Sequence, residues 1–138
     1  MHLTLEKILT LKNVPLFAGV SEDTLTDIID EGIETPVMIG TDLIKEGEST
    51  NDLYIVLQGQ LRVHKNGETI AEYNALSTFG ELAALETETA EATISALEDS
   101  ALIRINGSSL YRLMNEHASL EKNMFKMLCR RLREANRK

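Results

Sequence analysis

The spacing of apolar residues changes twice along the chain, and each change predicts a change of secondary structure. Leucine and isoleucine recur at helical spacing over residues 3–11 and again over residues 25–29. Ser21 is a residue type that caps helix starts, and Gly32 is one that ends them. Short apolar or alternating runs between turn residues follow, as is typical of β-strands. Helical spacing returns in the last quarter of the chain.

The middle of the chain predicts many short antiparallel strands. Asn66 and Gly67 between two alternating runs mark the clearest hairpin. We expect an α+β fold that is mainly β, a jelly-roll β-barrel of about eight strands flanked by N-terminal helices and two C-terminal helices. The expected strands cover residues 35–39, 42–45, 53–57, 60–65, 69–73, 92–97 and 101–106.

Two helices are expected at the C-terminal end. Ser108 or Ser109 is the predicted cap of the first, and Ser119 is the predicted start of the second. Arginines load the last turns of the second helix, where cations suit the negative end of the helix dipole. Its apolar stripe has two interpretations, a seam with a second copy of the chain or packing on its own barrel. The stripe comprises Leu120, Met124, Phe125, Met127, Leu128 and Leu132.

The length of 138 residues predicts a single domain over residues 1–138. Within it, residues 1–34 are expected to be helical, 35–106 to form the barrel and 107–138 to be helical again. The net charge is −8, which argues against nucleic-acid binding by this chain alone. Residues 1–120 carry 7 basic and 20 acidic side chains, whereas the remainder carries 7 basic and 2 acidic ones. The basic tail is a solvated helix end, a connection to another domain, or a contact for an acidic partner or surface.

Several chemistries lack support in the sequence. The lone Cys129 lies in an apolar helical pattern and is interpreted as a small buried hydrophobe in a reducing, cytoplasmic compartment. No apolar run approaches the roughly 18 residues of a membrane span, and no signal-peptide pattern is present. The three histidines have no metal-ligand spacing, which argues against a metal-binding cupin. We see no activated nucleophile and expect neither an enzyme nor a metal site.

Residues 79–85 form the most informative motif. Gly80 permits a tight turn and close approach of a ligand to the backbone. The apolar residues after it can form one helical turn, whose free N–H groups attract an anion. Glu81 beside them would repel that anion unless it binds a neutral part of the same ligand. A sugar phosphate offers both an anionic phosphate and neutral hydroxyls.

Three blocks in order resemble the cyclic-nucleotide-binding domain family, the type found in catabolite activator protein and in protein kinase A regulatory subunits. These blocks are residues 12–21, residues 44–59 and residues 79–83. The resemblance covers nearly the whole chain. It implies a regulatory sensor for cyclic AMP or cyclic GMP that signals through its C-terminal helix to a partner or attached domain. It also implies that the last helix can form a homodimer seam.

The resemblance also assigns roles to individual residues. Glu81 would accept a hydrogen bond from the ribose 2′-hydroxyl, while backbone N–H groups after it would meet the cyclic phosphate. From the residues alone, Glu81 can instead cap its own helix, and Thr93 can be an ordinary strand residue. The implied ligand-binding set is Gly80, Glu81, Leu82, Ala83, Ala84, Ala90 and Thr93.

The chain departs from the family pattern at Ala90. Family members that bind cyclic nucleotides carry an arginine about nine residues after the glutamate, and Ala90 occupies that position here. Losing such a charge-assisted partner costs about 2–5 kcal/mol, which is roughly thirty-fold to several thousand-fold in affinity. The neighbouring Glu86, Glu88 and Glu91 add negative charge to the same segment.

Two interpretations of this departure follow. A cation from another strand can replace the arginine, with Arg62, Lys65 and Arg104 as candidates, although the alternation around Arg62 and Arg104 predicts that they face solvent. Otherwise the chain is a degenerate family member that does not bind cyclic nucleotide and acts as a dimerisation or protein-interaction module.

Overall fold

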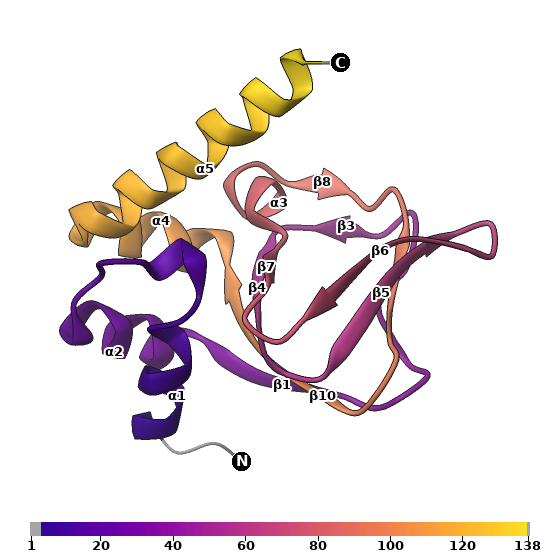
Figure 1. Ribbon diagram of the computed structural model, residues 1–138, viewed down its shortest axis with the longest axis horizontal. Helices are drawn as coiled ribbons and strands as arrows, with labels where there is room; N and C mark the ends of the chain where they lie inside the picture. Colours follow the sequence, from indigo (N-terminus) through magenta and orange to yellow (C-terminus); the bar gives the residue numbers. More distant parts are fainter. Residues whose placement is uncertain (1–3, 138) are drawn as a thin grey trace.

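The helices lie to one side of the β-sheets in the computed structural model, which describes residues 4–137 (Figure 1). The N-terminal layer consists of α1 (Thr4–Leu11), a 3₁₀ turn (Pro15–Phe17) and α2 (Glu22–Glu31). Ser21 caps α2 as predicted, because its hydroxyl accepts a hydrogen bond from the Thr24 N–H at 3.2 Å. Gly32 ends the same helix, which confirms that prediction too.

The strands form two four-stranded sheets and one two-stranded sheet, all with antiparallel pairing. The sheet orders are β1-β10-β4-β7, β2-β9-β5-β6 and β3-β8. The predicted α+β jelly-roll fold is confirmed. Within the described residues the strands are β1 (Ile33–Val37), β2 (Asp42–Ile44), β3 (Ser49–Thr50), β4 (Asp52–Gln58), β5 (Gln60–Lys65), β6 (Glu68–Asn74), β7 (Thr78–Phe79), β8 (Glu88–Thr89), β9 (Thr93–Ala96) and β10 (Ser100–Asn106).

Strand β4 explains how two hydrophobic cores arise from one sheet. Successive side chains of a strand point to opposite faces, and residues 53–57 of β4 are all buried. Leu53, Ile55 and Leu57 pack with the helices in one core. Tyr54 and Val56 face the other sheet in a second core. The first sheet is therefore covered on both faces, by helices on one side and by strands on the other.

The C-terminal helices are α4 (Gly107–Glu116) and α5 (Ala118–Asn136). The predicted serine caps were wrong. Asn106, the last residue of β10, caps α4 by accepting a hydrogen bond from the Ser109 N–H at 2.9 Å, and asparagine is as good an N-cap as serine. Residue 117 precedes α5, so the helix begins just before Ser119.

One face of α5 packs on the rest of the molecule and the other is exposed. Leu120 and Met124 are buried in the helix-side core, whereas Phe125 is 58% and Leu132 is 64% exposed. Cys129 is exposed as well, so its interpretation as a buried hydrophobe was wrong. The reason is that Cys129 lies on the same face of α5 as the exposed Phe125, whereas Met127 and Leu128 of the same turn pack against the helix-side core.

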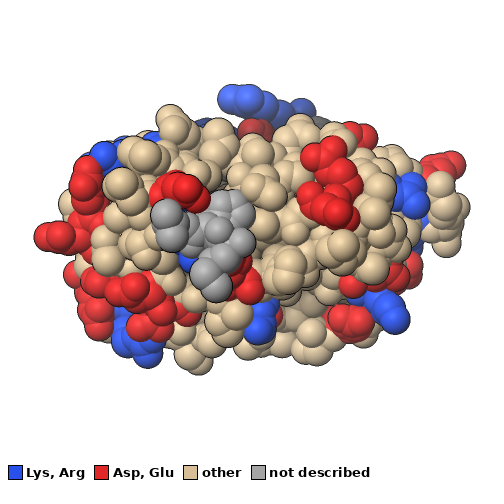
Figure 2. Space-filling view, turned by 90° about the horizontal axis from the view of Figure 1, so that it is seen from below, with Lys and Arg blue, Asp and Glu red and all other residues tan. Residues whose placement is uncertain are grey.

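Charge is spread unevenly over the surface. Acidic side chains form several separate patches on the face shown in Figure 2, and basic ones are sparser there. This distribution agrees with the net charge of −8. Among the helices formed by residues 4–137, none has the length and apolarity needed to cross a bilayer.

Candidate functional site

The turn from β7 into α3 (Glu81–Leu85) requires glycine at residue 80. Gly80 adopts φ +84°, in the left-handed region that side chains disfavour. A Cβ atom there would also lie 2.2 Å from the backbone oxygen of Asp52. The predicted tight turn is therefore present, and it brings the chain against the start of β4.

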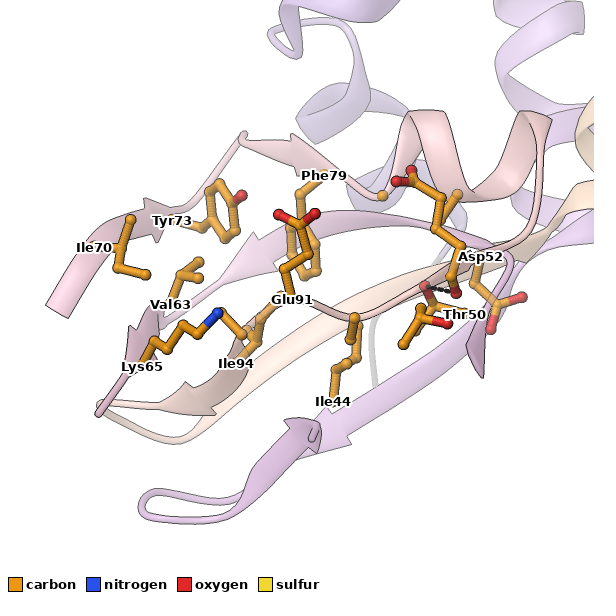
Figure 3. A pocket seen from close by; sticks show the side chains of 16 residues that line it. Ile44, Thr50, Asp52, Val63, Lys65, Ile70, Tyr73, Phe79, Glu91 and Ile94 are labelled. Atoms are coloured by element: carbon orange, nitrogen blue, oxygen red, sulfur yellow. Dashed lines mark hydrogen bonds between the residues drawn. The ribbon is translucent and has the colours of Figure 1, made fainter. Parts of the chain in front are cut away.

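A cavity of about 490 Å³ lies between this turn and the sheet that contains β5 and β6 (Figure 3). We call it the cassette cavity. Its volume is in the range typical of small-molecule sites. Its lining is largely apolar, with carboxylates and one ammonium group added. The lining residues are Ile44, Thr50, Asp52, Val63, Lys65, Ile70, Tyr73, Phe79, Gly80, Ala83, Glu88, Thr89, Ala90, Glu91, Ala92 and Ile94.

The structure brings only part of the predicted site together. Gly80, Ala83 and Ala90 line the cassette cavity. Leu82 is 45% exposed and lies outside that lining. Ala84 is packed in the helix-side core, and its N–H donates to the Gly80 carbonyl at 2.9 Å. That N–H is thus already used within the α3 turn.

Two further predicted residues have protein partners. The Thr93 hydroxyl accepts a hydrogen bond from the Glu46 N–H at 3.1 Å, which links β9 to the turn after β2. Glu81 is 1% exposed, and its carboxylate accepts a hydrogen bond from the Thr78 hydroxyl at 2.7 Å. Arg131 of α5 donates to the other carboxylate oxygen of Glu81 at 2.9 Å.

The Glu81 carboxylate thus has partners that neither interpretation of the sequence named. Glu81 is absent from the lining of the cassette cavity. Instead, the Arg131–Glu81 ion pair joins the cassette segment (residues 79–93) to the last helix. Arg131 was missed because it lies 50 residues away in sequence, within a run of arginines that resembles a solvated helix end.

Three aromatic rings form a stack beside the cavity, and two of them, Tyr73 and Phe79, line it. The ring centroids of Tyr73 and Phe79 are 4.5 Å apart with an interplanar angle of 1°, and those of Phe79 and Tyr54 are 5.1 Å apart. Burial raises the pKa of Tyr73, the charge of Glu81 raises it further, and the charge of Arg131 opposes this rise. Tyr73 lines the cavity and is also within electrostatic reach of the pair that holds α5.

Of the three cations considered as replacements for the missing arginine, Lys65 alone lines the cavity. Its ammonium lies 4.0 Å from a Glu46 carboxylate oxygen. Arg62 donates instead to the Thr69 hydroxyl, and Arg104 lies 3.5 Å from an Asp52 carboxylate oxygen. No guanidinium lines the cavity in the described part of the chain.

Backbone hydrogen bonds fix the position of Ala90. The Gly47 N–H donates to the Ala90 carbonyl and the Ala90 N–H donates to the Glu48 carbonyl, both at 2.8 Å. Next to this pair, β8 forms a two-stranded sheet with β3. In the family that the sequence resembles, this segment carries the phosphate-binding arginine. Here these backbone hydrogen bonds hold the segment in place, although residue 90 is an alanine.

The site thus consists of a short helix, α3, beside a cavity in an antiparallel jelly roll. The chain belongs to the cyclic nucleotide-binding domain family, since residues 36–117 match the family described as "Cyclic nucleotide-binding domain". The family prediction is therefore confirmed.

Relatives of known kind support this assignment. The chain is 27% identical over 119 residues to a cAMP-dependent protein kinase type II regulatory subunit of Drosophila melanogaster, covering 86% of this chain and 32% of that protein. The catabolite activator protein of Thermus thermophilus is similar with a TM-score of 0.79 and 26% identity, over 88% of this chain and 60% of that one. The N-terminal domain of a transcriptional regulator from Streptomyces coelicolor A3(2) has the same fold, with a TM-score of 0.81, 23% identity and 92% of each chain covered.

Proposed function

We propose that the chain is a regulatory sensor module in which a small molecule in the cassette cavity changes the docking of α5. The observation that carries this proposal is the Arg131–Glu81 ion pair, which connects the cassette segment to α5 through a carboxylate that is 1% exposed. Movement of the cassette segment would strain or break this contact. α5 would then pass the change to a partner or an attached domain, with no catalytic step by this chain.

The size of the response is limited by thermodynamics. A ligand shifts α5 only by the difference between its affinities for the docked and undocked states. Tyr73 supplies a physical route, because it lines the cavity and its ring stacks on Phe79, which directly precedes the turn at Gly80. The apolar side chains Phe125 and Leu132, exposed on α5, support a homodimer seam as one form of output.

A second candidate function is a protein-interaction module that binds no cyclic nucleotide. The observation that favours it is Ala90, which lines the cavity beside Glu88 and Glu91, where the resembling family places its phosphate-binding arginine. A cyclic phosphate there would meet negative charge and no guanidinium from the described residues.

The test is calorimetric titration with cyclic AMP and cyclic GMP, with amide hydrogen exchange of α5 as the readout of signalling. We expect Ala90→Arg to bind roughly thirty-fold to several thousand-fold more tightly than the natural chain. We also expect binding to Ala90→Arg to change amide exchange in α5. Ala92→Arg, which adds the same charge at another lining position, is the matched control.

Each result separates the candidates. Tight binding by the natural chain would mean that Lys65 replaces the arginine. Binding to Ala90→Arg with unchanged exchange in α5 would contradict signalling through that helix. Failure of Ala90→Arg to bind either nucleotide would favour the interaction module.

A further inference from the structure

The cassette cavity has an unusual charge for a member of a nucleotide-binding family. Its lining includes the carboxylates of Asp52, Glu88 and Glu91 and the single ammonium of Lys65, so the lining carries a net charge of −2. Asp52 is compensated by Arg104 at 3.5 Å, and Lys65 lies 4.0 Å from Glu46. The remaining negative charge belongs to Glu88 and Glu91, for which residues 4–137 provide no ion-pair partner.

Two of the three groups that the resemblance expects to bind a sugar phosphate, the Glu81 carboxylate and a side-chain cation at residue 90, do not face this cavity. The third is the set of backbone N–H groups at the start of α3, where Gly80 and Ala83 line the cavity. The carboxylate of Glu81 is held by Thr78 and Arg131 outside the lining. Ala90 offers only a methyl group, and its backbone N–H and carbonyl are hydrogen-bonded to the turn at residues 47–48. Apart from those N–H groups, a ligand would be recognised by the remaining side chains of the lining.

Those side chains are apolar and aromatic. Ile44, Val63 and Ile94 extend from three strands into the cavity, and the rings of Tyr73 and Phe79 stack at its side (Figure 3). Phe79 is stacked on both Tyr73 and Tyr54, so the outer face of Tyr73 is the cavity-lining ring face that this stack does not cover. An aromatic face with carboxylates nearby attracts organic cations, through the negative charge of the ring face and through direct Coulomb attraction. Glu91 extends over the same space from the opposite segment (Figure 3).

We propose that the cassette cavity takes a small organic cation with an apolar body, such as a protonated or quaternary amine that carries a ring. The apolar body would contact the aliphatic and aromatic lining, and Glu88 and Glu91 would face the positive charge. This inference rests on the proposed sensor function and replaces an anionic ligand by a cationic one.

Three probes of similar shape and different charge test the inference by amide NMR titration. They are phenyltrimethylammonium, its uncharged isostere tert-butylbenzene, and benzenesulfonate. We expect phenyltrimethylammonium to shift the amide signals of Gly80, Ala83 and Ala92 and to bind about tenfold more tightly than benzenesulfonate. The uncharged probe should lie between them.

Substitutions test whether Glu88 and Glu91 cause the preference for the cationic probe. The double variant Glu88→Gln, Glu91→Gln should lose the preference for the cation and keep the binding of tert-butylbenzene. Glu86→Gln removes one negative charge from an exposed neighbour outside the lining, and it should behave as the natural chain. The amide spectrum of each variant also shows whether it is folded.

Equal or tighter binding of benzenesulfonate would overturn the inference, as would the absence of cavity shifts with all three probes. The sensor proposal has a separate outcome. If cyclic AMP changes α5 exchange in Ala90→Arg while the probes show no charge preference, the sensor function stands and the cationic ligand class is wrong.

Discussion

Gly80 shows how one residue determines the position of the cassette segment. Its positive φ and its contact with the Asp52 backbone together leave no room for a side chain. Gly67, in the hairpin between β5 and β6, has almost the same φ of +82°, but a Cβ atom added there would meet no other atom within 4 Å. Comparing substitutions at the two glycines therefore separates the free-energy cost of a positive φ from the cost of the close contact with Asp52.

Gly80→Ala should destabilise the protein by more than about 3 kcal/mol, whereas Gly67→Ala should cost about 1–2 kcal/mol. The difference arises because the new methyl group at residue 80 meets a backbone oxygen, which cannot move aside easily. Urea unfolding of both variants measures it. Equal losses would mean that the turn at residue 80 relaxes freely.

Tyr73 gives a prediction for alkaline pH. Because its pKa is raised in the folded protein, an unfolded chain loses the tyrosine proton first, near pH of about 10. The stability that this proton difference provides is complete below that pH and is lost as the pH rises through the raised pKa. Tyr73→Phe should therefore lose less stability than the natural chain between about pH 9 and about pH 11. Urea unfolding across that range is the measurement, and identical alkaline losses would contradict the assignment.

At the scale of elements, the contact between α5 and the cassette segment is testable without any ligand. Arg131→Gln leaves the buried carboxylate of Glu81 with Thr78 alone. Arg131 is itself partly exposed. We therefore expect the free energy of local opening of α5 to fall by about 1.5 kcal/mol, near the lower end of the range for hydrogen bonds to charged groups. Amide hydrogen exchange over the second half of α5 should become faster.

Arg130→Gln is the matched control for this prediction. It removes the same charge from the neighbouring position, and the contact with Glu81 belongs to Arg131. Exchange in α5 should stay near that of the natural chain. If both variants accelerate exchange equally, the total positive charge of the helix holds it in place, and the single ion pair does not.

Sequence patterns predicted the elements that have a clear period and missed those that do not. β5 was predicted with its observed bounds, because its alternation covers six residues before a turn signal. β3, β7 and β8 have two residues each, too few to show any period, and their pairing depends on partners far away in sequence. The tight turn at Gly80 was predicted from its motif, whereas the contact of Arg131 depends on how α5 crosses the cassette segment, which no local pattern encodes.

At the scale of the whole molecule, the body of the chain and its C-terminal tail carry opposite net charge. Residues 1–120 have a net charge of −13 and the remainder has a net charge of +5. Salt screens both the repulsion within the acidic part and the attraction between that part and α5. The two parts of the molecule should therefore respond to salt in opposite directions.

Raising sodium chloride from about 0.05 M to about 0.5 M should slow amide exchange in the sheets and speed it in the second half of α5. Potassium chloride should act alike, because screening depends on ionic strength and not on the identity of the cation. A change of the same sign in both regions would show that charge attraction contributes little to the docking of α5.

The two backbone hydrogen bonds at Ala90 have a consequence for how this domain changes over evolution. Since neither bond uses a side chain, a substitution at residue 90 alters the chemistry of the cavity while the loop keeps its path. Ligand preference and foldability are therefore largely independent at this position. Replacements at residue 90 are therefore expected to change which molecules suit the cavity at little cost in stability, and a biosensor designer can use the same freedom.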